Sequence, residues 1–283
     1  MAGPIREPAV AGQFYPSDGD SLLREIEAAY RSPLGPGALP VVNPSGPRRI
    51  VGVVAPHAGY AYSGHVAATS YAALAVDGRP ATVIVLGFTH RSRLTGGALQ
   101  TSGAWRTPLG EAVIDEPLGS AIAILLPEMV DSVAALSGEH SLEVQLPFLQ
   151  HLYGDALRFV PVMMDDQSLE AARRVGGALA SAAAGRDVVI VVSTDMSHYV
   201  SAPVARRHDL YLAEFIRTLD GESLIREARR QGITMCGTGP TAAMIFVARA
   251  LGATHGEILA YHHSGEVTPM SEVVGYLSAK VTT

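Results

Sequence analysis

Histidines follow the ends of several strand-like runs in this sequence. Imidazole is the commonest transition-metal ligand among side chains and the usual proton shuttle near neutral pH. The three strongest runs, each rich in β-branched residues, are 50–55 before His57, 82–86 before His90, and 188–192 before His198. A shorter run, 257–260, precedes His262 and His263. Because open α/β sheets carry their chemistry beyond the carboxyl ends of the strands, this placement predicts a histidine-rich site at one sheet edge.

Acidic residues accompany two of the histidines. Asp195 lies three residues before His198, so its carboxylate can orient that imidazole through the second ring nitrogen, or can instead cap the following turn. His140 lies between Glu139 and Glu143 in a segment that is typical of a helix start. Residues three or four apart share a helix face, so His140 and Glu143 can point together into a site. The alternative is a solvated first turn whose acidic residues are favoured by the helix dipole.

Cys236 is the only thiol in the chain, and it lies just before an apolar helical run that ends at Leu251. Thr238 is suited to cap that helix, and Pro240 is suited to its first turn. A thiol near a helix N-terminus feels partial positive charge, which favours the thiolate. Thiolate is a soft ligand for copper, zinc or iron. The alternative is a buried, inert cysteine.

The elements that must position these residues alternate along the chain from residue 49 onward. One helical pattern, 22–30, precedes that region, and the helical patterns within it cover 63–74, 117–125, 139–152, 168–184, 203–219, 223–231 and 240–251. Strand patterns cover 50–55, 82–87, 157–162, 187–193, 256–261 and 272–281. Alternation on this scale predicts an α/β fold in which helices flank a central, mostly parallel or mixed sheet.

Composition narrows the class of protein. The chain has 283 residues, of which 48% are hydrophobic, so it can bury one sizeable core, and we expect a single domain over 1–283. The Pro/Gly-rich segment 31–48 is expected to be a loop. A net charge of -6 with no basic stripe disfavours nucleic acid as a partner. No apolar stretch is long enough to span a membrane, and a single cysteine fits a reducing compartment, so we expect a cytoplasmic protein.

Six short motifs, in this order, resemble those of the Memo family, whose prokaryotic members are called AmmeMemoRadiSam system protein B. They are 6–16 (REPAVAGQFYP), 56–64 (PHAGYAYSG), 107–110 (TPLG), 139–143 (EHSLE), 195–198 (DMSH) and 236–237 (CG). The resemblance covers the chain from residue 6 to about 277.

This resemblance implies a single α/β domain similar to class III (LigB-type) extradiol dioxygenases, which hold non-haem Fe(II) with two histidines and a glutamate. Carried over by position, His57 and His90 match the histidine ligands, and Cys236 stands where those enzymes have the glutamate. His198 matches their acid–base histidine, with Asp195 beside it. His140 would line the same pocket.

The sulfur ligand changes what the resemblance implies about chemistry. Replacing a hard carboxylate oxygen by a soft thiolate sulfur favours Cu(I) or zinc, so cleavage of a catechol ring is not implied. The family also implies two functional companions, an AMMECR1-type protein and a radical-SAM protein.

Three functions follow as hypotheses. The first is a metal-dependent redox protein that holds non-haem Fe(II) or Cu, with zinc as a further choice, through His57, His90 and Cys236. The second is a non-catalytic module that keeps the dioxygenase-like pocket and binds a peptide or protein partner, although phosphopeptide capture usually relies on arginines. The third makes Cys236 the nucleophile of a hydrolase or transferase.

Overall fold

Four parallel strands occupy the middle of the sheet in this computed structural model, which describes residues 3–91, 94 and 96–283. In spatial order they are β8 (Arg158–Met164), β3 (Thr82–Phe88), β9 (Val188–Ser193) and β2 (Ile50–Ala55). Nearly every residue in them is buried, as expected of strands covered on both faces. Because β3, β9 and β2 are direct neighbours, the segments that follow them start side by side.

The outer strands make the sheet mixed. Next to β2 lie β12 (Val273–Thr282) and β11 (His255–His263), paired antiparallel, and β10 (His198–Val200) also pairs with β12. On the other side lie β6 (Gly110–Ile114), β5 (Ala104–Thr107) and β1 (Ile5–Arg6). Two short strands, β4 (Ala98–Leu99) and β7 (Val130–Asp131), pair beside β8.

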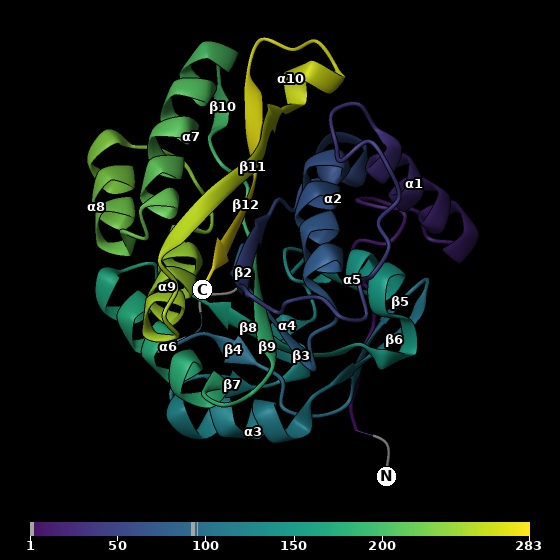
Figure 1. The fold of residues 1–283 in the computed structure, drawn as a ribbon, viewed down its shortest axis with the longest axis vertical. Helices are drawn as coiled ribbons and strands as arrows, with labels where there is room; N and C mark the ends of the chain where they lie inside the picture. Colours follow the sequence, from purple (N-terminus) through teal and green to yellow (C-terminus); the bar gives the residue numbers. More distant parts are fainter. Residues whose placement is uncertain (1–2, 92–93, 95) are drawn as a thin grey trace.

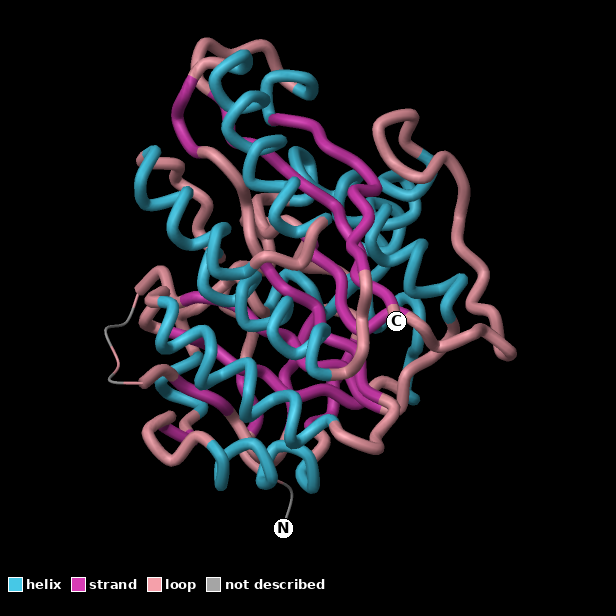
Figure 2. Tube along the Cα trace, turned by 60° about the vertical axis from the view of Figure 1, so that its left-hand side comes forward, coloured by secondary structure: helices cyan, strands magenta, loops and turns pink. Residues whose placement is uncertain are grey.

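Helices cover both faces of the sheet (Figures 1 and 2). One face carries α3 (Glu116–Leu125), α6 (Leu169–Ala183), α7 (Ala202–Arg217), α8 (Gly221–Gln231) and α9 (Thr238–Ala250). The other face carries α1 (Gly19–Arg31), α2 (Tyr60–Asp77) and α5 (Leu146–Tyr153). Successive residues of one strand point to opposite faces of the sheet, so a hydrophobic core lies on each face. Val54 packs in the core on the first of these faces, and Val53 packs in the core on the other. The expected α/β fold with a mixed, mostly parallel sheet is therefore confirmed.

The expected helix over 139–152 is shorter than the sequence pattern suggests. Residues 139–142 form no helix, Glu143–Gln145 form a 3-10 turn (η1), and α5 begins at Leu146. The Glu139 carboxylate accepts the backbone N–H of Ser141, and such a side-chain hydrogen bond competes with helical bonding. Pro147 lies in the first turn of α5, where its missing N–H costs nothing.

Several short elements carried no clear sequence signal. They are β1, β4, β5, β6, β7 and β10, together with α4 (Val133–Leu136), α10 (Ser264–Val267) and a 3-10 turn, η2 (Gly154–Ala156). The Pro/Gly-rich segment after α1 has no helix or strand before β2 begins. Within the described residues, no helix combines the length and the apolar character needed to cross a membrane.

Candidate metal centre

Two histidines meet beyond the carboxyl ends of β2 and β3, which lie on either side of β9. Pro56 follows the last residue of β2 and His57 comes next, while His90 lies two residues after β3. The two imidazole rings face each other edge to face, with centroids 5.0 Å apart. Burial, followed by the nearby His90 and His140 charges, holds the pKa of His57 well below its usual range. His57 is therefore a neutral imidazole, which is the form that binds metals.

His140 completes a cluster of three imidazoles. Its ring centroid lies 4.7 Å from that of His90 and 5.3 Å from that of His57. Burial lowers the pKa of His140 to about 4, although the neighbouring Glu139 charge opposes that shift. His140 therefore borders the same space as the two expected ligands, as the family resemblance implied.

Cys236 reaches this cluster from the loop before α9. Gly237 allows the approach, because a Cβ at that position would lie 2.5 Å from the Thr194 Cβ. The thiol Sγ lies 3.3 Å from His57 Nε2 and accepts the Asp195 backbone N–H at 3.2 Å. The helix begins at Thr238 with Gly237 as its N-cap, so the expected cap at Thr238 is off by one residue.

The Cys236 thiol is not activated in the way that a helix N-terminus suggests. Burial and the neighbouring Asp195 charge raise the pKa of the thiol to about 12. Burial thus opposes the thiolate that a helix N-terminus was expected to favour, because desolvation disfavours the charged form. A raised thiol pKa counts against the hydrolase or transferase hypothesis, in which Cys236 is the nucleophile.

One donor atom each from His57, His90 and Cys236 fits a single metal ion. These three atoms lie within 4.8 Å of one another. Metal–nitrogen and metal–sulfur bonds of about 2.0–2.3 Å can bridge such a gap with small side-chain movements. The Nδ1 of each histidine is also held by a hydrogen bond: His57 Nδ1 lies 3.0 Å from Ser193 Oγ, and His90 Nδ1 donates to Glu139 Oε1 at 3.0 Å. That leaves both Nε2 atoms available, as is usual for ligand histidines.

Glu139, His140 and His90 form a second group with ligand atoms this close together. The Glu139 carboxylate, however, already accepts the His90 backbone N–H at 2.6 Å, His90 Nδ1 at 3.0 Å and the Ser141 N–H at 2.8 Å. Burial raises the pKa of Glu139, but the His90 hydrogen bonds outweigh it and lower that pKa to about 2. Glu139 is thus a charged acceptor that holds His90, with little capacity left for an ion.

His198 lies at the same end of the sheet, but Asp195 does not orient its ring. His198 Nδ1 donates to the Thr234 carbonyl at 2.9 Å, and its backbone N–H donates to the Thr234 hydroxyl. A carbonyl only accepts, so the hydrogen bond assigns the Nδ1–H tautomer and leaves Nε2 as an acceptor. The His198 charge lowers the pKa of both His57 and Asp195, so His198 is within electrostatic reach of the cluster.

Asp195 instead positions the loop that carries His57. Its Oδ1 accepts the His57 backbone N–H at 2.7 Å. Burial raises the pKa of Asp195 to about 6, against the lowering effect of the hydrogen bonds from the 57–58 backbone. Of the two roles expected for Asp195, neither is found: His198 Nδ1 bonds to the Thr234 carbonyl, and the Asp195 carboxylate bonds to the His57 backbone rather than to the following turn.

Glu143 does not share the site with His140. Its carboxylate is fully buried and pairs with Arg6, and it also accepts the Tyr15 hydroxyl at 2.5 Å and two backbone N–H groups of the N-terminal segment. Both sequence expectations for Glu143 are therefore wrong, since it neither faces the metal centre nor lies in a solvated turn. The reason is that 139–145 is not a continuous helix, so the spacing of three between His140 and Glu143 does not align their side chains.

His262 and His263 belong to a separate group at the end of β11. The His262 ring lies 5.6 Å from that of His65 on α2, and its Nδ1 pairs with Glu266 at 2.8 Å. Strand β11 is two positions away from β2, so the fourth histidine run does not reach His57.

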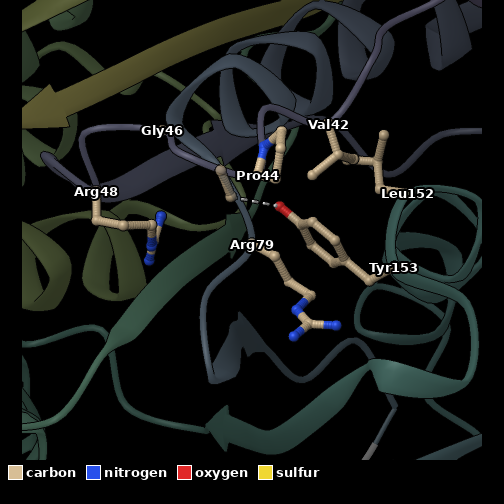
Figure 3. Close-up of a pocket in the computed structure, with 8 residues that line it drawn as sticks. Val42, Pro44, Gly46, Arg48, Arg79, Leu152 and Tyr153 are labelled. Carbon is tan, nitrogen blue, oxygen red and sulfur yellow. Dashed lines mark hydrogen bonds between the residues drawn. The ribbon is translucent and has the colours of Figure 1, made fainter.

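A cavity of about 450 Å³ lies at the opposite end of the parallel strands (Figure 3). It lies before β2, β3 and β8, and among its lining residues are Arg48, Arg79 and Tyr153. Arg48 is neutralised by Asp77 and Asp187, and the Tyr153 hydroxyl donates to the Gly78 carbonyl at 3.4 Å. The described residues that line this cavity include no histidine, cysteine or carboxylate, so we place the chemistry at the carboxyl ends of the strands.

The sequence did not predict the four residues that hold the histidines through hydrogen bonds, directly or through Ser193. They are Glu139, Ser193, Gln145 and Thr234. Glu139 had a signal, because it stands beside His140 in a motif that was already singled out. The other three are uncharged residues whose roles depend on contacts between distant segments.

The fold and the cluster together define an α/β protein with a candidate His₂Cys metal centre beyond the carboxyl ends of its central strands. The Memo-like protein family matches residues 6–280 of the chain. A MEMO1 family protein of Methanopyrus kandleri is 47% identical over 274 residues, which cover 96% of each chain. Relatives from Methanothermobacter thermautotrophicus and Ignicoccus hospitalis are 44% and 39% identical, and each alignment covers at least 96% of both chains. The chain belongs to the Memo-like protein family.

Proposed function

We propose that this chain is a metal-dependent redox protein whose centre is formed by His57, His90 and Cys236. The observation that carries the proposal is the convergence of three donor atoms within 4.8 Å, from segments that are far apart in the sequence. The hydrogen bonds at both Nδ1 atoms support it further, because they leave the Nε2 atoms as the ring nitrogens that can bind an ion.

The donor set favours iron or copper, and zinc fits the same ligands. Imidazole suits all three metals, and a thiolate shifts the preference toward soft ions. Iron or copper bound here would supply one-electron redox chemistry. The Cys236 thiol must release its proton when it becomes a ligand, so binding is expected to liberate one proton.

The remaining side chains divide into proton transfer and positioning. His198 is proposed as the proton acceptor, because its Nδ1–H is held by Thr234 and its Nε2 is available. His140 is proposed to contact a bound substrate, since it borders both ligand histidines. Asp195 is proposed as a positioning residue that holds the His57 backbone. An AMMECR1-type protein and a radical-SAM protein are proposed as its functional partners.

Elemental analysis of anaerobically purified protein tests the centre. We expect about one iron or copper ion per chain, and we expect the Cys236→Ser and His57→Gln variants to lose most of it. His255→Gln is the matched control, because His255 is an exposed histidine at the start of β11. Undiminished metal in Cys236→Ser would remove the sulfur from the ligand set. If the wild-type protein binds no metal, the metal-dependent hypothesis is excluded, and the hypothesis of a partner-binding module remains.

A further inference from the structure

A buried chain of hydrogen bonds leads from His57 Nδ1, the ring nitrogen opposite Cys236, to Gln145. His57 Nδ1 lies 3.0 Å from Ser193 Oγ, and Gln145 Nε2 lies 2.8 Å from the same oxygen. Ser193 is the last residue of β9, and Gln145 is the last residue of η1. All three side chains are buried, so their polar groups must satisfy one another.

Two neighbours determine which way the Gln145 amide points. The Tyr71 hydroxyl donates to Gln145 Oε1 at 2.5 Å, and Gln145 Nε2 donates to the Pro56 carbonyl at 3.0 Å. A carbonyl oxygen only accepts, so a flipped amide would set two acceptors against each other. The amide nitrogen must therefore face Pro56, which directs its second N–H to Ser193.

The Ser193 hydroxyl then has no proton left for His57. Its single proton is donated to the Ser141 carbonyl at 2.6 Å, and its oxygen accepts from Gln145. Nδ1 of His57 can complete the contact only as a donor. The other tautomer would need the Ser193 proton, and the Ser141 carbonyl would then face an oxygen without a hydrogen between them.

We propose that Gln145 is a positioning residue of the metal centre. Through Ser193 it holds His57 in the tautomer with the proton on Nδ1, so that the Nε2 lone pair faces Cys236 Sγ, 3.3 Å away. This inference rests on the proposed function, because the free lone pair matters only if an ion binds there. Loss of such an indirect partner typically lowers metal affinity about 10–100-fold.

The test compares metal affinity in two variants that lose the same kind of side chain. Co²⁺ is titrated into metal-free protein under anaerobic, reducing conditions, and its absorption spectrum reports the coordination. We expect Gln145→Leu to bind Co²⁺ about 10–100-fold more weakly than the wild type, with a changed spectrum.

Gln100→Leu is the matched control. Gln100 is equally buried, donates to the Pro4 and Ser102 carbonyls at 3.1 and 2.7 Å, and accepts the Trp105 indole N–H at 2.8 Å. Both variants should lose thermal stability to a similar extent, and only Gln145→Leu should lose Co²⁺ affinity. An equal loss of affinity in both would reduce the effect to general destabilisation and overturn the inference.

The tautomer itself can be measured in the wild-type protein. Long-range ¹H–¹⁵N NMR spectra of the metal-free protein should show His57 protonated on Nδ1, with the His57→Gln variant used for assignment. A proton on Nε2 would overturn the inference whether or not the variants fold. Wild-type protein that binds Co²⁺ while Gln145→Leu binds it equally well would overturn the role of Gln145 alone. Wild-type protein that binds no Co²⁺ would overturn the proposed function.

Discussion

The Glu139 carboxylate controls the orientation and the donor strength of His90 without being a ligand itself. Its two oxygens accept hydrogen bonds from the backbone N–H and from Nδ1 of His90, so the His90 ring is held in one orientation. A negative charge behind an imidazole also makes the opposite nitrogen a stronger donor to a metal. The strongly lowered pKa of Glu139, about 2, means that this charge persists at every physiological pH.

Glu139→Gln should therefore weaken metal binding without emptying the site. We expect Zn²⁺ affinity, measured by titration calorimetry, to fall about 10–100-fold, because the amide keeps the shape but removes the charge. Glu222→Gln, at a surface ion pair with Arg173, is the control and should bind like the wild type. Unchanged affinity in Glu139→Gln would show that the carboxylate holds only the loop.

At the scale of elements, the N-terminal segment braces the turn from which Gln145 and His140 extend. Arg6 lies fully buried over the Trp105 ring, pairs with Glu143, and donates to the Glu139 carbonyl at 2.6 Å. The Glu143 carboxylate in turn accepts the backbone N–H groups of Ala9 and Val10. The segment before α1 thus acts as part of the core, although its described residues, 3–18, form one short strand only.

Breaking this buried pair should be costly. Removing one partner leaves an uncompensated charge inside the protein, so we expect Arg6→Met to lower the free energy of unfolding by about 3–5 kcal/mol. Arg106→Met, which breaks exposed pairs with Glu7 and Glu111, should cost about 0–1 kcal/mol. Urea denaturation of both variants measures the difference, and equal losses would contradict the proposed bracing.

At the scale of the whole molecule, several buried histidines are kept neutral. Burial lowers the pKa of His65 to about 4, with a further contribution from His262 and an opposing one from Glu266. Burial also lowers the pKa values of His57, His140 and His151. Unfolding restores each pKa to about 6.5, so below that pH the unfolded chain binds protons that the folded protein does not.

Stability should consequently fall as the pH drops from about 6.5 toward 4, and be fully present above that window. We expect the urea midpoint of the metal-free protein to be lower at pH 5 than at pH 7. His65→Gln should reduce this difference, whereas the exposed His255→Gln should leave it unchanged. A midpoint that rises between pH 7 and pH 5 would contradict the sign derived from these pKa directions.

Much of the fold was predictable because its signals are local. The strand at 50–55 was predicted to the residue, and α6 and α8 lie within two residues of the patterns that predicted them. The short strands at the sheet edges and the break before α5 were not predictable. Their backbone geometry depends on pairing partners and on side-chain hydrogen bonds from other segments, which outweigh local propensity.

The sequence by itself determined which residues could meet at the sheet edge, because strand ends and the histidines that follow them are set by local patterns. Only the tertiary structure decided which group forms a hydrogen bond with the Nδ1 of each imidazole. Ser193 is 136 residues from His57, Glu139 is 49 from His90, and Thr234 is 36 from His198. A hydrogen bond depends on atoms within about 3 Å of each other, and no spacing along the chain encodes such a distance between remote segments.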